Sequence, residues 1–260
     1  VLAELELMRG TWGVKAFEVI DDAFNVNMKR ALRICELLAA SDLGLSWTCP
    51  NGIRADRIDA KLATAMAAAG CTAAQVGVES GDPEVFARIR KGCTLADIDC
   101  GIRALQGAGI QVGGFFIIGL PGDSRAGVRA SVSFAKRHGI SAHFNLLVPY
   151  PETEVWDWVH SAEARLLHPP EEGMHFTTTG DLVPVFDTVD FPAEERLAAY
   201  EMANTCLGRF DLLMPPPQQM GHRQYYRRAV ALMWRHCPGQ IPGFLWRRIA
   251  GSLRRRLLRR

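Results

Sequence analysis

Residues that can bind a small ligand recur directly after apolar runs in the first part of the chain. They are Asp21-Asp22, Arg54, Glu79-Ser80 and the segment Gly119–Gly122, which is Gly-Leu-Pro-Gly. Carboxylates accept hydrogen bonds, arginine makes two-point contacts with carboxylates, and glycine lets a backbone approach a ligand closely. Glu79 is the most informative, because a carboxylate at the tip of an apolar strand is costly to bury without a partner.

The apolar runs predict five short buried strands, over residues 14–20, 45–49, 74–78, 113–118 and 141–148. Amphipathic helical patterns separate them, over residues 27–40, 59–69, 83–89, 94–107 and 125–138. Parallel strands that alternate with helices wind one way, through right-handed crossovers, into an open or closed barrel. Chemistry in such a barrel lies at the carboxyl ends of the strands, so the ligand-binding residues are expected to converge on one site.

The order and spacing of these motifs resemble the radical S-adenosylmethionine (SAM) superfamily, and within it the subgroup associated with a cobalamin-binding domain. The matching segments are Asp21–Phe24, Asn51–Asp56, Gly70-Cys71, Val76–Gly81, Lys91-Gly92, Phe116–Gly122 and Pro149–Pro151. The set in register is more specific than any single motif. The resemblance implies an α/β fold, a partial (β/α)6 barrel like a TIM barrel, of which this chain lacks the first strand. A mostly helical C-terminal extension follows the barrel.

The resemblance also implies a [4Fe–4S] cluster on a Cys-x3-Cys-x2-Cys loop after the first strand. The seven cysteines stand at positions 35, 49, 71, 93, 100, 206 and 237, and no two are closer than Cys93 and Cys100. This spacing builds no local cluster or zinc loop, so no metal ligand is assigned within the chain. Because the chain begins at Val1 within a helical pattern, we expect a fragment whose cluster loop lies upstream. A clusterless relative is the alternative.

The resemblance assigns SAM-binding roles to residues at the first three strand ends. Asp21 or Asp22 would accept hydrogen bonds from the amino group of SAM, although a solvated turn or a helix cap is the alternative. Glu79, with Ser80 beside it, would contact the ribose or the methionine end of SAM. Arg54 would bind the SAM carboxylate or form an ion pair with Glu79.

The last two strand ends complete the predicted cofactor site. Gly119 and Pro121 would pack against the adenine and ribose, with a plain tight turn as the alternative. His143 and Asn145 alternate with apolar residues, so both are expected to point into the barrel, where a structural role for the histidine is the alternative. Pro149 follows in a Pro-Tyr-Pro motif. The sequence identifies no catalytic residue.

Charge is distributed unevenly along the chain. No Asp or Glu follows Asp211, whereas eleven arginines do, which leaves 19 Lys and Arg against 28 Asp and Glu, a net charge of −9, over residues 1–211. An acidic body argues against a nucleic-acid-binding face. Gly243–Arg260 places leucine and isoleucine four residues apart among arginines, which is typical of a basic amphipathic helix. Such a helix could lie on an anionic membrane surface, dock on the acidic barrel or, as the least favoured option, bind nucleic acid.

Three regions are therefore predicted: a barrel core over 1–155, an elaboration near the barrel mouth over 156–214, and a basic helical tail over 215–260. No apolar run reaches the roughly 18 residues that span a membrane. Scattered cysteines are typical of reduced thiols. These features favour a cytoplasmic protein, with peripheral membrane contact through the tail as an option.

The activity implied by the resemblance is reductive cleavage of SAM to a 5′-deoxyadenosyl radical, with an external electron donor and a small-molecule or lipid substrate. SAM and a [4Fe–4S] cluster are the expected cofactors, and cobalamin is an optional third. A cobalamin-dependent methyltransferase is the leading hypothesis, and this chain alone is expected to be inactive. The alternatives are a methylthiotransferase or oxidoreductase without cobalamin, and a clusterless barrel that acts as a binding or scaffold module.

Overall fold

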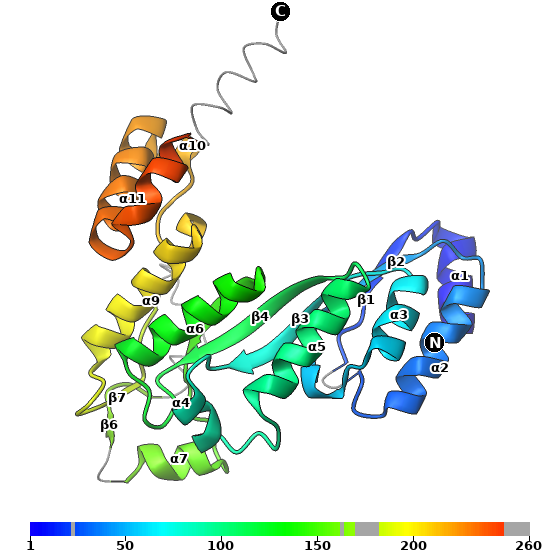
Figure 1. Ribbon diagram of the computed structural model, residues 1–260, viewed down its shortest axis with the longest axis horizontal. Coiled ribbons are helices and arrows are strands. Elements are labelled where there is room, and N and C mark those ends of the chain that lie inside the picture. The colour runs from blue at the N-terminus through cyan, green and yellow to red at the C-terminus, as the bar shows by residue number, and fades with distance from the viewer. Residues whose placement is uncertain (22–23, 162–163, 170–181, 247–260) are drawn as a thin grey trace, which may run out of the picture. The chain divides into compact units, whose positions relative to one another are not determined.

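The computed structural model describes residues 1–21, 24–161, 164–169 and 182–246 (Figure 1). The chain divides into two compact units, Val1–Leu147 and Val148–Arg260. The predicted division into three regions stays a prediction.

The first unit is built on a parallel five-stranded sheet with the order β1-β2-β3-β4-β5. Its strands are β1 (Ala16–Glu18), β2 (Ser46–Ile53), β3 (Cys71–Glu79), β4 (Gln111–Ile118) and β5 (Ser141–Leu146). Each strand pairs in parallel with the next one in the chain. This arrangement confirms the predicted α/β fold, because chain-order neighbours joined by helices form the wall of a barrel.

Helices alternate with these strands. They are α1 (Leu2–Trp12), α2 (Met28–Ala40), α3 (Ala60–Ala68), α4 (Pro83–Arg88), α5 (Leu95–Gly107) and α6 (Arg125–His138), with a short 3-10 helix at Ala55–Arg57. Figure 1 shows α3, α5 and α6 along one face of the sheet. The core beneath these helices includes four side chains that are 0% exposed, Val76, Val78, Phe116 and Ile118. The opposite face of the sheet is more polar and more exposed.

The helix starts follow from local sequence. Polar side chains accept a hydrogen bond from a backbone N–H of the first turn at Asn27, Asp59, Asp82, Thr94 and Ser124. Thr94 and Asp97 form the predicted capping box. Such caps satisfy N–H groups that lack a partner inside the helix, so the predicted helix positions agree closely with the observed ones.

Strand β2 corrects one expectation. It was predicted to end at Cys49, with Pro50–Ile53 as a loop, but it continues to Ile53 through a bulge. Cys49 lies opposite Ala74 and Ile53 opposite Val76, so the β2 segment between them is longer than its partner. Proline is tolerated in a strand at a bulge because a bulge needs fewer ladder N–H groups.

The second unit combines a small hairpin with helices. Its elements are α7 (Glu154–Val159), β6 (Ala164–Leu166), β7 (Phe186–Thr188), α9 (Ala193–Leu207), α10 (Pro217–Met220) and α11 (His222–His236), with 3-10 turns at Phe210–Leu212 and Pro238–Gln240. Strands β6 and β7 are antiparallel. Arg196 of α9 is 2% exposed, and its guanidinium lies 4.3 Å from the ring centre of Phe186 and donates to the carbonyl of Phe191. The unit thus has a core of its own.

The C-terminal part of this unit bears on two predictions. The helix predicted at 223–236 is confirmed as α11. Residues 241–246 are helical, but 247–260, most of the predicted amphipathic helix Gly243–Arg260, lie outside the described residues. Among the described residues, no helix combines the length and hydropathy needed to cross a membrane.

Candidate cofactor-binding site

The carboxyl ends of the five strands share one edge of the sheet, because all five are parallel and adjacent. Arg54 follows β2, Glu79 ends β3 and Gly119 follows β4. The first unit therefore brings most of the predicted site residues to one edge, as parallel α/β folds do. Pro149 belongs to the second unit, where it is buried.

Glu79 forms an ion pair with Lys91, not with Arg54 as one reading of the sequence had it. Lys91 Nζ lies 2.7 Å from Glu79 Oε1 and donates to the Gly77 carbonyl at 2.5 Å. The side chains of Lys91 and Glu79 are 17% and 22% exposed. A Cβ added at Gly77 would collide with Glu79 Oε1, so the glycine makes room for this pair. Lys91 was part of a recognised motif, yet sequence reasoning gave it no role in the site.

The backbone at Glu79 takes an uncommon conformation. Its φ is +64°, in the left-handed region that few residues with a side chain adopt. The β3–β4 register shifts between Gly77 and Glu79, so the strand leaves regular pairing there. Backbone strain of this kind clusters at ligand sites, where the surrounding structure holds it in place. Here the Lys91 contact provides that support.

Ser80 is 2% exposed and holds the turn into α4. Its backbone N–H donates to the Val78 carbonyl at 2.8 Å, and its Oγ accepts from the Asp82 N–H at 3.1 Å. The next residue, Gly81, donates to Ser131 Oγ of α6 at 2.8 Å. The Ser80 hydroxyl therefore has a structural partner, whatever it contributes to a ligand.

Arg54 is held by Asp56 in a two-point contact. Its Nε and one terminal nitrogen each lie 2.7 Å from an Asp56 carboxylate oxygen. The hydrogen bonds from Arg54 hold the pKa of Asp56 below its usual value. The guanidinium is thus already paired with a carboxylate, and a SAM carboxylate would have to compete with Asp56 for it.

Asn25 fixes the backbone of Arg54 and was not singled out from sequence. Its side chain is 0% exposed, accepts from the Arg54 N–H at 2.9 Å and donates to the Arg54 carbonyl at 2.7 Å. This clasp joins the loop after β1 to the end of β2. Nothing local in the sequence distinguishes this asparagine, because its partners lie 29 residues away.

The Gly119–Gly122 loop is built around the Asp123 carboxylate. Asp123 is 5% exposed, and its two oxygens accept from the N–H groups of Gly119 and Ser124 at 2.9 and 2.8 Å. Gly119 has a φ of +96° and Gly122 a φ of +76°. The Arg88 guanidinium occupies the space where a Cβ of Gly122 would stand. The loop therefore has a defined conformation around the buried Asp123 carboxylate. Pro121 remains partly exposed on its surface.

The end of β1 is more exposed. Asp21 forms an ion pair with Arg30 of α2 at 3.1 Å, and their side chains are 43% and 50% exposed. Phe24 packs edge-on against Trp47, with ring centres 5.7 Å apart, and anchors the loop. Asp22 lies outside the described residues.

His143 and Asn145 lie on the sheet face opposite the helices, as expected. Their neighbours Ala142 and Phe144 are buried beneath the helices, whereas His143 is half-buried and Asn145 exposed. The His143 ring is 5.8 Å from Phe115 on the same face. Gln75, also on this face, has a buried Oε1 without a hydrogen bond within the described part of the chain. The inner face thus offers polar groups beside an aromatic ring.

Three buried thiols lie on the other side of the sheet. Cys35, Cys49 and Cys71 are at most 5% exposed. Burial raises the pKa of Cys35 to about 12, and hydrogen bonding with Cys71 and burial raise the pKa of Cys49. Within the described residues, no group of three His, Cys, Asp or Glu side chains could hold a metal ion. These residues therefore do not fit an iron–sulfur cluster.

Comparison with known proteins identifies the same resemblance independently. The model of the radical SAM superfamily matches residues 2–135. The chain is 34% identical over 159 residues to the uncharacterized methyltransferase PH0819 of Pyrococcus horikoshii, covering 61% of this chain and 34% of that protein. It is 30% identical over 149 residues to cytidylyl-2-hydroxyethylphosphonate methyltransferase of Streptomyces wedmorensis, covering 55% and 28%. The chain thus spans about a third of the length of these curated relatives.

A solved structure shares the fold. The radical SAM methyltransferase TsrM from Kitasatospora setae, determined with cobalamin and a [4Fe–4S] cluster bound, superposes with a TM-score of 0.59 at 18% identity. The match covers 84% of this chain and 46% of TsrM. Because the superfamily model covers more than half of the chain, and the strand edge carries the family motifs in order, this chain belongs to the radical SAM superfamily.

Proposed function

We propose that this chain supplies the SAM-binding core of a cobalamin-dependent radical SAM methyltransferase. The observation that carries the proposal is the paired, conformationally restrained Glu79 at the middle of the strand edge, in a chain of the radical SAM family. Two relatives with methyltransferase names and the fold of TsrM support the reaction class. The chain spans only about a third of the length of these relatives, so the activity of the whole protein is part of the proposal.

Glu79 is suited to a ribose diol. Lys91 occupies Oε1, while Oε2 makes no hydrogen bond to any residue that the structure describes. A carboxylate oxygen free to accept is what two neighbouring hydroxyl donors require. The Lys91 contact fixes the position of the carboxylate, so the diol would meet a preformed acceptor.

The remaining strand ends would contact the rest of SAM. Gly119 and Pro121 present backbone and ring surface to the adenine, since glycine allows close approach. Asp21 would exchange its exposed contact with Arg30 for the amino group of SAM. His143 and Asn145 on the inner face would contact the substrate or the cofactor.

The iron–sulfur cluster and the cobalamin would be held by parts of the full-length protein other than the residues described. In this family the cluster, when bound, supplies the electron that cleaves SAM, and cobalamin carries a methyl group. The residues of this chain would position SAM and exclude water around it. The proposal also includes an external electron donor and a substrate that is a small molecule or a lipid.

We also propose a cytoplasmic location, with peripheral membrane contact through Gly243–Arg260. The sequence pattern alone supports this contact, because 247–260 lie outside the described residues.

The test uses the protein expressed from its complete reading frame and reconstituted anaerobically with iron and sulfide. We expect about four irons per chain and formation of 5′-deoxyadenosine from SAM. Bound cobalamin, seen by its visible absorbance, together with methyl transfer distinguishes the proposal from a methylthiotransferase or oxidoreductase. Absence of iron and of SAM cleavage would contradict it and leave the clusterless binding barrel.

A pair of variants tests the role of Glu79. Glu79→Gln should raise the Kd for SAM on the order of tenfold, since it removes a charged hydrogen-bond acceptor. Glu84→Gln, an exposed acid on α4 with the same change in charge, should leave the Kd unchanged. Equal SAM affinity in both variants would remove Glu79 from the site.

A further inference from the structure

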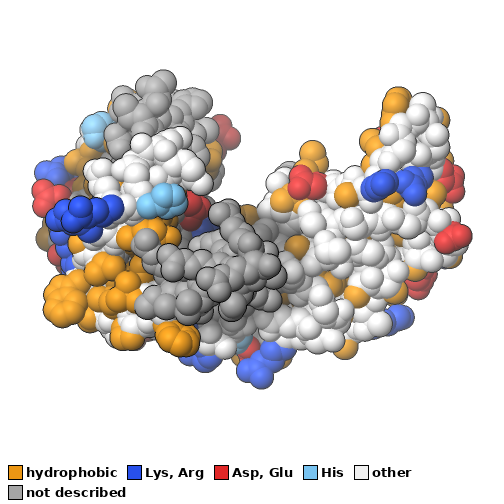
Figure 2. Space-filling model, turned by 90° about the horizontal axis from the view of Figure 1, so that it is seen from above, with side chains coloured by type: hydrophobic (Ala, Val, Ile, Leu, Met, Phe, Trp, Pro, Cys, Tyr) orange, Lys and Arg blue, Asp and Glu red, His pale blue; other side chains and the backbone are white. Residues whose placement is uncertain are grey.

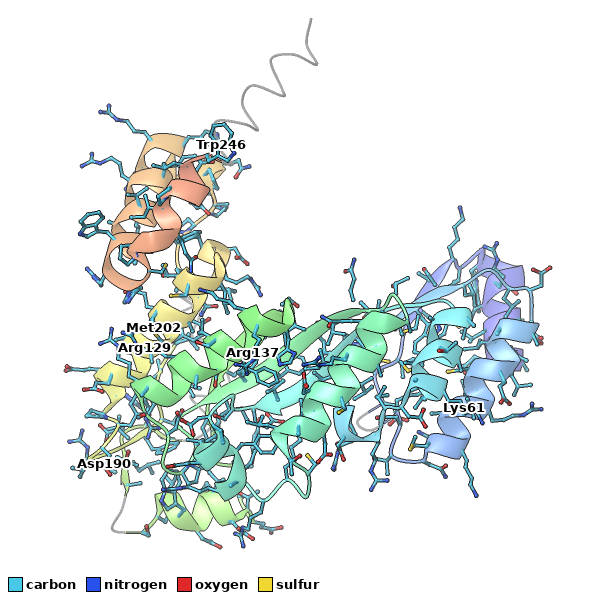
Figure 3. All side chains as sticks on the ribbon, in the orientation of Figure 1. Lys61, Arg129, Arg137, Asp190, Met202 and Trp246 are labelled. Carbon is cyan, nitrogen blue, oxygen red and sulfur yellow. The ribbon has the colours of Figure 1, made fainter. Side chains whose placement is uncertain are left out.

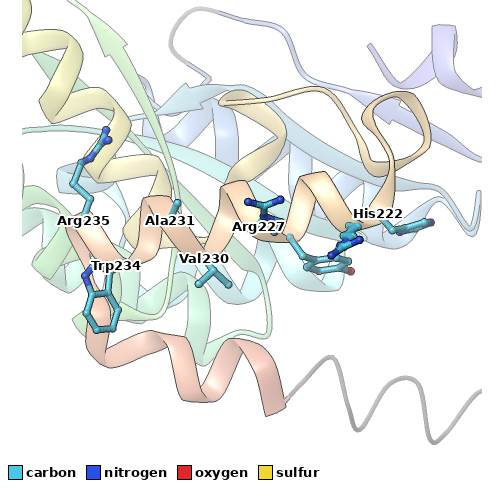
Figure 4. Close-up of a pocket in the computed structure, with 8 residues that line it drawn as sticks. His222, Arg227, Val230, Ala231, Trp234 and Arg235 are labelled. Carbon is cyan, nitrogen blue, oxygen red and sulfur yellow. The ribbon is translucent and has the colours of Figure 1, made fainter.

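An open groove runs along helix α11 in the second unit. Its lining includes Arg227, Val230 and Trp234 (Figure 4). Tyr226 also lines it and packs against Phe244, with ring centres 6.0 Å apart. Cations, rings and aliphatic groups together select no single class of ligand, so this groove does not identify a partner.

The inner face of the five-stranded sheet, opposite α3, α5 and α6, is more selective. It carries every second residue from 73 to 77 on β3, from 113 to 117 on β4 and from 141 to 145 on β5, and none of these is Asp, Glu, Lys or Arg. The Glu79–Lys91 pair, which covers Gly77, is neutral as a pair. Figure 2 shows charged side chains scattered over the outer surface of the protein instead. A charged ligand group would lose its hydration on the inner face without gaining an unpaired opposite charge, so this face favours an uncharged group.

Gln75 carries the feature that points to a ligand. Its Oε1 is buried and has no hydrogen-bond partner in the part of the chain that the structure describes. This oxygen lies against Gly113 on the neighbouring strand β4, where an added Cβ would collide with it. A buried acceptor without a partner is costly, so a ligand that supplies an N–H or O–H group would remove that cost on binding.

A rotation of the Gln75 carboxamide would present this acceptor to a ligand. Gly113 lies between Gln75 and Ser141 in the sheet, and Ser141 Oγ is 2.6 Å from the place of a Cβ added at Gly113. A half-turn about the last side-chain bond would bring Nε2 toward Ser141 Oγ, to which it can donate, and would turn Oε1 to the open side of the face. Both ends of the amide would then have partners once the ligand supplies its donor.

Phe115 offers a flat surface beside this acceptor. It is the next inner-facing residue of β4 after Gly113, and its ring centre lies 5.8 Å from that of His143. A Cβ added at Gly52 of β2 would be 3.5 Å from the Phe115 ring and 3.8 Å from the Gln75 carbonyl oxygen, so the ring and Gln75 are neighbours. Because Gly52 has no side chain, it leaves this part of the ring uncovered. A flat group can therefore stack on Phe115 while its donor meets Gln75.

The adenine of SAM is also flat and carries N–H donors, but its proposed place is too distant. Adenine is proposed to lie at Gly119, which follows Gly113 by six residues. Six residues of a strand span roughly 20 Å, so adenine at Gly119 does not reach the Gln75 carboxamide beside Gly113. The group on the inner face therefore belongs to a second molecule.

We propose that the inner face binds a flat, uncharged ring of the substrate, which stacks on Phe115 and donates an N–H or O–H hydrogen bond to Gln75. Gln75 is then the residue that determines specificity for a ring with a donor. This inference rests on the proposed function, because it names the substrate class of that methyltransferase.

The experiment is equilibrium dialysis of small aromatic probes against the full-length reconstituted protein, with SAM present and no reductant. Phenol has an O–H donor, and anisole replaces it with a methyl ether. Phenol should bind about tenfold more tightly than anisole, since only phenol pairs with Oε1. Benzamide should likewise bind at least about tenfold more tightly than benzoate, because the anion finds no unpaired cation on this face.

Variants assign these preferences to named side chains. Gln75→Met keeps the length of the side chain and removes the acceptor, so phenol should bind no more tightly than anisole. Gln111→Met, at an exposed position of β4, is the matched control and should keep the preference for phenol. Phe115→Leu should weaken the binding of both probes several-fold without changing their ratio, because stacking does not depend on the donor.

Three outcomes would overturn the inference. Two are equal affinities of the wild-type protein for phenol and anisole, and an unchanged preference for phenol in Gln75→Met. The third is displacement of phenol by SAM, which would assign the inner face to adenine. Dialysis requires neither iron nor SAM cleavage, so a failure of cleavage with the phenol preference intact would overturn the proposed function alone. Cleavage without that preference would overturn this inference alone.

Discussion

Two strand ends in the first unit each carry an acid paired with a base, and they differ in burial. At β3, Glu79 and Lys91 are 22% and 17% exposed, and Lys91 also binds the Gly77 carbonyl. At β1, Asp21 and Arg30 are 43% and 50% exposed and lie 3.1 Å apart. Exposed pairs contribute little to stability, whereas removal of one partner from a buried pair is costly. The β3 pair is therefore preformed, and the β1 pair can open without a large loss.

The largest effect should follow loss of the Lys91 ammonium. Lys91→Met leaves the Glu79 carboxylate and the Gly77 carbonyl without their partner, and should lower the free energy of unfolding by about 2 kcal/mol. Urea titration measures this change. Lys61→Met, at an exposed position on α3 (Figure 3), is the matched control and should change it by less than about 0.5 kcal/mol. Equal losses of unfolding free energy in the two variants would mean that Lys91 contributes no more to stability than an exposed lysine.

A methyl group at Gly77 should have the next largest effect. In Gly77→Ala the new Cβ meets Glu79 Oε1 and Lys91 Nζ, and both side chains must shift toward solvent. We expect a loss of about 1–2 kcal/mol in the free energy of unfolding and weaker SAM binding in the reconstituted protein. Gly107→Ala, where no atom lies within 4 Å of the added Cβ, is the control. SAM affinity unchanged in Gly77→Ala would contradict a role for this geometry.

The Arg54–Asp56 pair lies between the β3 and β1 pairs in exposure, at 34% and 11%. It makes the stability of the fold depend on pH. The pKa of Asp56 is lowered by the hydrogen bonds from Arg54, below its usual 3.8. The pair therefore stabilises the fold fully above about pH 3.8, and the contribution is lost as the pH falls through the lowered pKa. Asp56→Asn should cost about 1 kcal/mol at pH 7 and show a flatter pH dependence below pH 4. Identical acid profiles for the two proteins would refute this assignment.

The smallest effect on stability is expected at the exposed strand end. Asp21→Asn should change the free energy of unfolding by less than about 0.5 kcal/mol, because the pair with Arg30 is open to water. SAM affinity in the reconstituted protein should nevertheless fall if Asp21 binds the SAM amino group. A large loss of stability would show that the two strand ends are alike after all.

Reactivity of the thiols compares buried with exposed positions in the first unit. Burial raises the pKa of Cys35 to about 12, and Cys49 is also shielded, whereas Cys100 is exposed. At pH 8 an alkylating reagent should modify Cys100 first and leave Cys35 and Cys49 untouched in the native protein. Mass spectrometry of peptides measures this order. Early modification of Cys49 would mean that its side of the sheet opens readily.

The sequence alone determined the parts of this protein that depend on local interactions. Apolar runs and caps such as Thr94 with Asp97 located the helices and four of the five strand ends within a few residues, because capping and burial patterns act over one or two turns. The order of the motifs also identified the family. The first conclusion needs only neighbours in the chain, and the second needs only the order of motifs along it.

Tertiary structure alone decided which groups meet. The partner of Glu79 is Lys91 and not Arg54, Asn25 clasps a backbone 29 residues away, and β2 continues through a bulge to Ile53. Ala229, Leu232 and Met233 of α11 are likewise buried because Phe210 and Met214, which are distant in the sequence, pack against them. Contacts between distant segments depend on register and packing, which no local pattern encodes.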